Sequence, residues 1–161
     1  MAQGRESLSW NNYVAVSTAI IAVLAAIASL QAGTNVSLML LEKNNANLYQ
    51  NQANKQWNTY LAQEIVSLSE NTSITNIQIQ KQAQQALQRK TDDLENKVMD
   101  ATQKAQIYFQ RNSNLSTAGT FLDIAIALSA MSTLIKKKYF WIFSLLLAAA
   151  GIYFLTLGLI I

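Results

Sequence analysis

The sequence predicts an all-α membrane protein with three transmembrane helices and a long antiparallel helical hairpin, a coiled-coil stalk, between the first and the second. Apolar residues are concentrated at the two ends of the 161-residue chain, whereas the middle is rich in Gln and Asn. The chain contains no proline and only five glycines, and no glycine lies between Gly33 and Gly119. Helix breakers are therefore absent from the whole middle segment.

The first predicted span covers residues 13–33 and follows a short N-terminal segment, residues 1–12. Residues 13–32 carry no charge, and about 20 apolar residues suffice to cross a ~30 Å hydrocarbon core. Trp10 precedes this span, where an indole ring favours the headgroup layer. A cleaved signal peptide is the alternative. It is disfavoured because the apolar run exceeds the ~7–15 residues of a signal core.

The second and third predicted spans cover residues 117–135 and 139–161 and are separated by a basic loop, residues 136–138. So short a loop makes the two spans antiparallel, because a backbone in lipid must satisfy its hydrogen bonds within its own helix. The loop is Lys136, Lys137 and Lys138, which suit anionic lipid headgroups. Trp141 follows and marks the same headgroup level.

The three lysines also predict the orientation of the chain. Basic residues in short loops stay in the cytoplasm, whereas loops longer than about 60 residues cross the membrane with little regard to charge. We therefore expect the N-terminus in the cytoplasm and the stalk on the other side, which in a bacterium is the periplasm. Lys43, Lys104 and Arg111 weaken this asymmetry.

The predicted stalk covers residues 34–116, with its tip near residues 69–76. Apolar residues recur there every three or four positions on both sides of a Ser/Thr/Asn-rich break. On the outgoing arm they include Ala46, Tyr49, Ala53, Trp57 and Tyr60, and on the returning arm Leu87, Leu94, Val98, Ala101 and Ala105. The two arms are of similar length, on the order of 55–60 Å at about 1.5 Å per residue. A disordered polar loop is the alternative.

Asp123 is the one acidic residue within a predicted span, and an intramembrane carboxylate is costly and a candidate for function. It could specify assembly or line an ion path. The alternative is a structural carboxylate that lies near enough to the interface to meet water, or that bonds a neighbouring Ser or Thr.

Small residues recur three or four positions apart in the first two spans, where they let helix backbones approach closely in lipid. They are Ala15, Ala19, Ala22, Ala26, Ser29 and Gly33, followed by Ala125, Ser129 and Thr133. A single stalk would leave much of its apolar stripe exposed. Both observations favour a homo-oligomer.

Trp57 and Tyr60 are three residues apart and therefore share one helix face. We interpret them as an aromatic seam within the stalk, with a binding surface as the alternative.

Catalytic chemistry is not predicted. The chain has no His and no Cys, which removes the commonest metal ligands, the usual general base and the thiol nucleophile. We predict no enzyme activity, no cofactor and no metal. The net charge of +3 is explained by the lysine loop beside the membrane, so nucleic acid is not an expected partner.

One segment resembles a known family. Ala53, Gln56, Trp57, Tyr60, Ala62 and Ile65 match the pattern Ala-x-x-Gln-Trp-x-x-Tyr-x-Ala-x-x-Ile of a bacterial family designated domain of unknown function 4337. The order of span, polar helical region and two closely spaced spans is also similar. The sequence departs at Lys55 and Gln63, where the family commonly has Asp and Lys. The resemblance implies a bacterial inner-membrane protein and no particular activity, substrate or cofactor.

The sequence therefore predicts a non-catalytic integral membrane protein with a structural, scaffolding or accessory role. Its expected partners are the lipid bilayer, further copies of itself and a larger membrane protein complex. A small oligomeric ion-conducting pore that uses Asp123 is the alternative.

Overall fold

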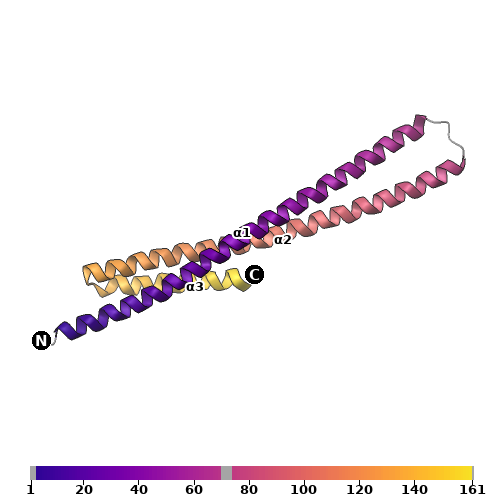
Figure 1. Cartoon of the computed structure of the whole chain (residues 1–161). Coiled ribbons are helices and arrows are strands. Elements are labelled where there is room, and N and C mark those ends of the chain that lie inside the picture. The colour runs from indigo at the N-terminus through magenta and orange to yellow at the C-terminus, as the bar shows by residue number, and fades with distance from the viewer. Residues whose placement is uncertain (1–2, 70–73, 161) are drawn as a thin grey trace. The chain divides into compact units, whose positions relative to one another are not determined.

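The computed structural model describes residues 3–69 and 74–160, and the side chains of residues 10–66 and 81–160. Within these ranges the chain forms three helices and no strand (Figure 1). They are α1 (Gln3–Ser69), α2 (Ile74–Ile135) and α3 (Lys138–Ile160). All three are long and apolar enough to cross a membrane. The predicted all-α fold with three potential spans is thus confirmed.

The chain divides into two compact units. One, which we call the apolar unit, contains Met1–Ser37 and Ile107–Ile161, and the other, the polar unit, contains Leu38–Gln106. Hydropathy alone predicts boundaries at 33/34 and 116/117. The apolar unit begins earlier on α2 because side chains that precede residue 117 also pack in it, and Leu115 is almost fully buried there.

Helices α1 and α2 each continue through the boundary between the units without interruption. Residues from Gln3 onward, expected to form a short separate segment, already belong to α1. Nothing in the sequence stops either helix, since proline is absent and isolated glycines within a helix cost only about 1 kcal/mol each.

The connection between α2 and α3 is shorter than predicted, because Lys138 is already the first residue of α3. Helix α2 ends at Ile135, and Lys136 adopts a left-handed backbone conformation with φ of 56°. This conformation commonly terminates a helix at the position after its cap. The Ser132 hydroxyl donates to the Lys137 carbonyl at 3.3 Å and helps to close the turn.

Small residues on α3 allow it to pack closely against α2 in an antiparallel arrangement. Gly151 lies against Leu122, and Gly158 lies against Leu115. The Ser144 hydroxyl donates to the Ala125 carbonyl at 2.7 Å, and both residues are buried. Residue numbers fall along α2 as they rise along α3, as the short connection requires.

Helix α1 completes the apolar unit. Its buried residues Ile21, Ala25, Ala28 and Ala32 form one core cluster with residues of α2 and α3. A hydrogen bond joins the Thr18 and Ser129 hydroxyls. Phe121 and Phe154 stack at 5.7 Å between ring centroids. Such mixed packing of small residues and interhelical hydrogen bonds is typical of helices that associate in lipid.

Among the described side chains of the polar unit, the buried apolar ones come from the predicted stripes: Ala53, Leu94, Ala101 and Ala105. Its exposed surface carries two ion pairs four residues apart, Lys97 with Asp93 and Lys104 with Asp100. The hydrogen bond to the Asp93 carboxylate raises the pKa of the Lys97 ammonium. The predicted tip, residues 69–76, includes residues 70–73, which lie outside the described part of the chain.

The close approach of α3 to α2 predicts that Gly151→Ala destabilises the apolar unit. An added Cβ would lie 2.8 Å from Leu122 Cγ and 3.3 Å from the Ala118 carbonyl oxygen, and overpacking of this kind costs about 1–3 kcal/mol. Thermal unfolding in detergent, followed by tryptophan fluorescence, should show a lower Tm.

The matched control is Gly119→Ala, because a Cβ at Gly119 meets only the Ser29 hydroxyl oxygen, at an ordinary contact distance of 3.8 Å. Its Tm should be unchanged or higher, since replacing glycine within a helix gains about 0.5–1 kcal/mol. Equal Tm values for the two variants would contradict the packing of α3 on α2.

Candidate functional site

Contacts with α3 place Asp123 deep within the apolar unit. Its neighbour Leu122 packs on Gly151, which lies well inside α3 (Lys138–Ile160) and far from both helix ends. The 23 residues of α3 would measure about 34 Å at 1.5 Å per residue, enough to cross a hydrocarbon core of about 30 Å. If α3 crosses the membrane, Asp123 lies near the middle of the bilayer.

Contacts with α1 give the same depth independently. The Thr18 hydroxyl meets Ser129, whereas Ser29 lies beside Gly119. Asp123 falls between Gly119 and Ser129 on α2 and is therefore level with the middle of the predicted first span. Both sets of contacts thus place Asp123 away from the ends of the apolar unit.

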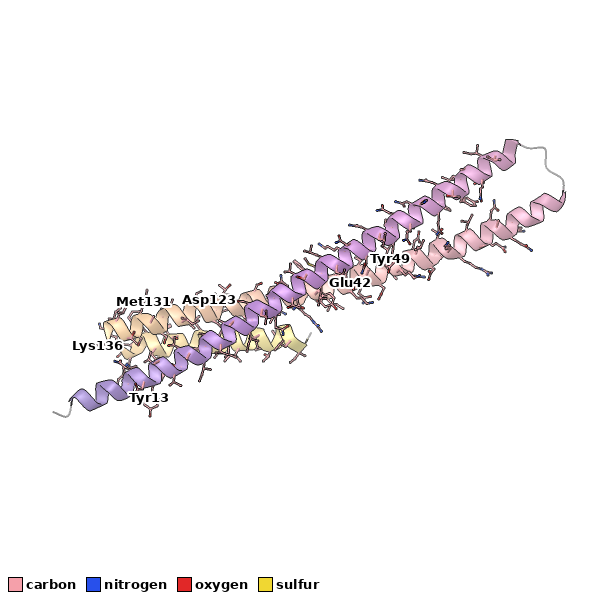
Figure 2. All side chains as sticks on the ribbon, in the orientation of Figure 1. Tyr13, Glu42, Tyr49, Asp123, Met131 and Lys136 are labelled. Atoms are coloured by element: carbon pink, nitrogen blue, oxygen red, sulfur yellow. The ribbon has the colours of Figure 1, made fainter. Side chains whose placement is uncertain are left out.

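Asp123 is exposed on the outward side of α2. Figure 2 shows Asp123 and Met131 along the edge of α2 opposite to α3. Within the described part of the chain, no group donates a hydrogen bond to its carboxylate. The nearby Thr120 hydroxyl instead donates to the Ser116 carbonyl at 3.0 Å. The alternative of a carboxylate bonded to a neighbouring Ser or Thr is not what the structure contains.

Small and polar side chains form one row with Asp123 on this side of α2, and the large side chains of Ile124 and Met131 are also exposed on α2. One row of exposed residues, spaced three or four apart, consists of Ser116, Thr120, Asp123 and Ala127. The buried side of α2 lies opposite to this row and carries Leu115, Leu122 and Ser129. The row is therefore directed away from the packed interior of the apolar unit.

A second row of small residues lies on α1. It consists of Ala22, Ala26, Ser29 and Gly33, all of them exposed. Ser29 lies beside Gly119 of α2, since a Cβ added at Gly119 would be 3.8 Å from the Ser29 hydroxyl oxygen, and Asp123 follows Gly119 by one helical turn. The two rows therefore flank the same contact on its outward side. We call these eight residues the Asp123 face.

The other outward surfaces of the apolar unit carry large apolar side chains instead. On α1 these include Val16, Ile20, Val23, Ile27 and Leu30, and on α3 they include Ile142, Phe143, Leu146 and Tyr153. Such surfaces suit lipid tails. The Asp123 face differs from them both in side-chain size and in polarity, and small residues are typical of helix contacts in membranes.

Predicted headgroup markers come together at the end of the apolar unit that holds the α2–α3 turn. The rings of Trp10 and Trp141 meet edge to face, with centroids 4.9 Å apart. The Lys138 ammonium lies 5.3 Å from the centre of the Trp10 ring, and the Trp141 indole donates to the Ser17 hydroxyl at 3.1 Å. Lys136 and Lys137 are exposed beside them.

Trp57 and Tyr60 also lie together, with their rings stacked at 5.3 Å and 14° between planes. They form one wall of a hollow of about 360 Å³ in the polar unit, whose other wall includes Lys81, Gln84 and Leu87 of α2. Trp57 is 52% exposed. The aromatic pair thus lines this hollow and is partly open to solvent.

No metal site is found among the described residues. In that part of the chain no three His, Cys, Asp or Glu side chains gather closely enough to hold an ion. Asp123 lies 12 residues before Ile135, the last residue of α2, which is about 18 Å at 1.5 Å per residue, and so it remains apart from the lysines that follow.

The comparisons with known proteins give one family. The chain matches the family described as Domain of unknown function (DUF4337) over residues 10–161. No curated protein and no solved structure matches the chain.

The three tryptophans predict a depth pattern that fluorescence can measure. In single-tryptophan variants, made by replacing the other two with Phe, Trp10 and Trp141 should be quenched by lipids brominated near the headgroup, because rings at this level lie in the interface. Trp57 should be quenched by aqueous iodide and by no brominated lipid. Quenching of Trp57 by lipid would contradict the assignment of the polar unit to water.

Proposed function

The chain belongs to the DUF4337 family, whose description states no activity, and we propose that it is a non-catalytic membrane protein that acts as a structural or accessory component of a membrane assembly. The single observation that carries this proposal is the exposed Asp123 carboxylate, deep in the apolar unit and without a hydrogen-bond donor among the described residues. A carboxylate at that depth in lipid costs about 2.5–3.5 kcal/mol. Assembly with another protein surface would offset this cost.

The small side chains of the Asp123 face support the same proposal. A second helix can approach the backbone closely where side chains are small, and this close packing drives helix association in lipid. The large apolar residues elsewhere on the unit are where lipid is accommodated. One side of the apolar unit is thus suited to protein and the others to the bilayer.

An ion-conducting pore, the alternative, is supported less well. Ser116, Thr120 and Asp123 are polar, but the same side of α2 continues as Ala127 and Ala130. A water path needs polar or wide lining across the whole hydrocarbon region. The alanines that continue this side of α2 favour helix packing over ion conduction.

The polar unit would be an antiparallel helical hairpin that extends the assembly outside the bilayer. Two neighbouring hollows support this arrangement. Trp57 and Tyr60 line one with residues of α2 from Lys81 onward, and Gln50 and Ala53 line the next with residues of α2 up to Glu95. Later residues of α1 accompany earlier residues of α2, as antiparallel helices require.

The cellular location that fits these features is the inner membrane of a bacterium. The lysines of the α2–α3 turn and the N-terminus would face the cytoplasm, and the polar unit would face the periplasm. The cluster of Trp10, Trp141 and Lys138 would then mark the cytoplasmic headgroup layer.

Extraction in polymer-bounded native nanodiscs tests the proposed assembly. We expect native mass spectrometry to find two or more copies of the chain in each disc, or the chain with another membrane protein, since the Asp123 face remains uncovered in a single copy. Discs that hold only single copies, with no other protein, would refute the assembly.

The hairpin predicts which residues of the polar unit can be joined by a disulfide. Ala53 and Thr91 line the same hollow, so the double variant Ala53→Cys/Thr91→Cys should form an intramolecular disulfide upon mild oxidation. A shift in electrophoretic mobility that is reversed by a reductant would detect it.

Ala53→Cys/Lys81→Cys is the matched control. Lys81 precedes Thr91 by ten residues, which is about 15 Å along a helix and beyond disulfide reach. Similar rates in both variants would indicate a disordered polar segment in place of the hairpin.

A further inference from the structure

The Asp123 face carries complementary groups at matching depths. Asp123 provides a hydrogen-bond acceptor, and the exposed hydroxyl of Ser29 provides a donor that bonds no described residue. Ser29 is level with Gly119, one helical turn from Asp123 and therefore about 6 Å away in depth. A surface with both a donor and an acceptor within one helical turn of depth can pair with an identical surface.

Copies of one chain in a membrane share the same orientation and depth. A symmetry axis along the membrane normal places identical residues of two copies at identical heights. Asp123 of one copy would then lie level with Asp123 of the other and about one helical turn, or 6 Å, in depth from its Ser29. A second copy already carries polar groups at this depth, whereas a partner with an unrelated sequence would have to contain such groups independently.

Steric conditions on the face also suit such a contact. Ala22 and Ala26 of α1 are exposed beside Asp123, and Ala127 follows it on α2. A Cβ added at Gly33 would meet nothing within 4 Å, so the α1 backbone is open to approach there. Small side chains on both helices let a second copy bring its own helices within hydrogen-bonding distance.

We propose that a second copy of this chain packs on the Asp123 face and that the Asp123 carboxyl hydrogen-bonds to hydroxyl or carboxyl groups of that copy near mid-bilayer. This inference rests on the proposed structural role and adds the identity of the partner and the residues that recognise it. Asp123 thus acts as a recognition group and takes part in no chemical step.

Disulfide crosslinking tests the contact, since the chain has no cysteine of its own. Ala127→Cys places a thiol on the Asp123 face, one turn from the carboxylate. Ile20→Cys places a thiol on the surface with large apolar side chains, at a similar depth because nearby Thr18 meets Ser129. When the full-length protein is oxidised in liposomes, Ala127→Cys should form disulfide-linked dimers at least about tenfold faster than Ile20→Cys does.

The carboxyl is tested in the Ala127→Cys variant. When Asp123→Leu is added to this variant, the dimerisation constant measured by crosslinking should fall about tenfold. The reason is that a hydrogen bond between helices in the membrane is lost. Asp123→Asn should keep most of the crosslinking, since the amide also forms hydrogen bonds. Far-UV circular dichroism and the Tm in detergent would establish that each variant folds.

The outcomes separate this inference from the proposed function. Faster crosslinking at Ile20→Cys, or equal crosslinking with leucine and asparagine at position 123, would overturn the inference. The proposed assembly would still stand if native nanodiscs contained several copies or another protein. Single copies in the nanodiscs, together with no crosslinking at either position, would overturn both.

Discussion

Hydrocarbon offers no hydrogen bonds, and this constraint governs the apolar unit. Every backbone amide must bond within its own helix, and every polar side chain must find a partner inside the protein. Several hydroxyls obey this rule by donating to carbonyls one turn earlier, as Thr117, Thr120 and Thr156 do, or to another helix, as Ser144 does. Asp123 stands out because a single copy of the chain gives it no such donor among the described residues.

The two units solve different problems of solvation. The apolar unit cannot gain free energy by hiding apolar surface from lipid, so it packs through glycine, alanine and serine and through a few interhelical hydrogen bonds. The polar unit is rich in charged and amide side chains. It buries a narrow apolar stripe that includes Ala53 and Leu94. One continuous helix, α1, contributes to both units.

The sequence predicts much of this because composition and periodicity are local properties. The apolar runs, the absent prolines and the lysine loop are sufficient to predict three helices and their approximate ends. The same reasoning identifies Asp123 as the one acid in the predicted spans, and it predicts that Trp10, Trp141 and the lysines lie near the headgroups. The match of residues 10–161 to DUF4337 confirms the family that Trp57 and Tyr60 indicate.

Register and facing could not be predicted, because they depend on which side chains meet between helices. Hydropathy starts the second span at residue 117 and so places Asp123 only two turns inside it. The contact between Leu115 and Gly158 extends the packed pair of α2 and α3 to residues before 117. Asp123 therefore lies nearer the middle of the packed part of α2 than hydropathy predicts. Similarly, the spacing of Ala22, Ala26 and Ser29 predicts a helix face made of small side chains. It does not predict that this face lies beside Asp123.

The central claim is that lipid solvates the apolar unit, and alkaline carbonate washing of membranes tests it most directly. Carbonate at high pH strips proteins held by surface contacts and leaves proteins whose helices cross the hydrocarbon core. The account predicts that the intact chain stays in the membrane pellet and enters solution only with detergent. Its release into the carbonate supernatant would contradict the account, because helices that cross a bilayer cannot leave it in this way.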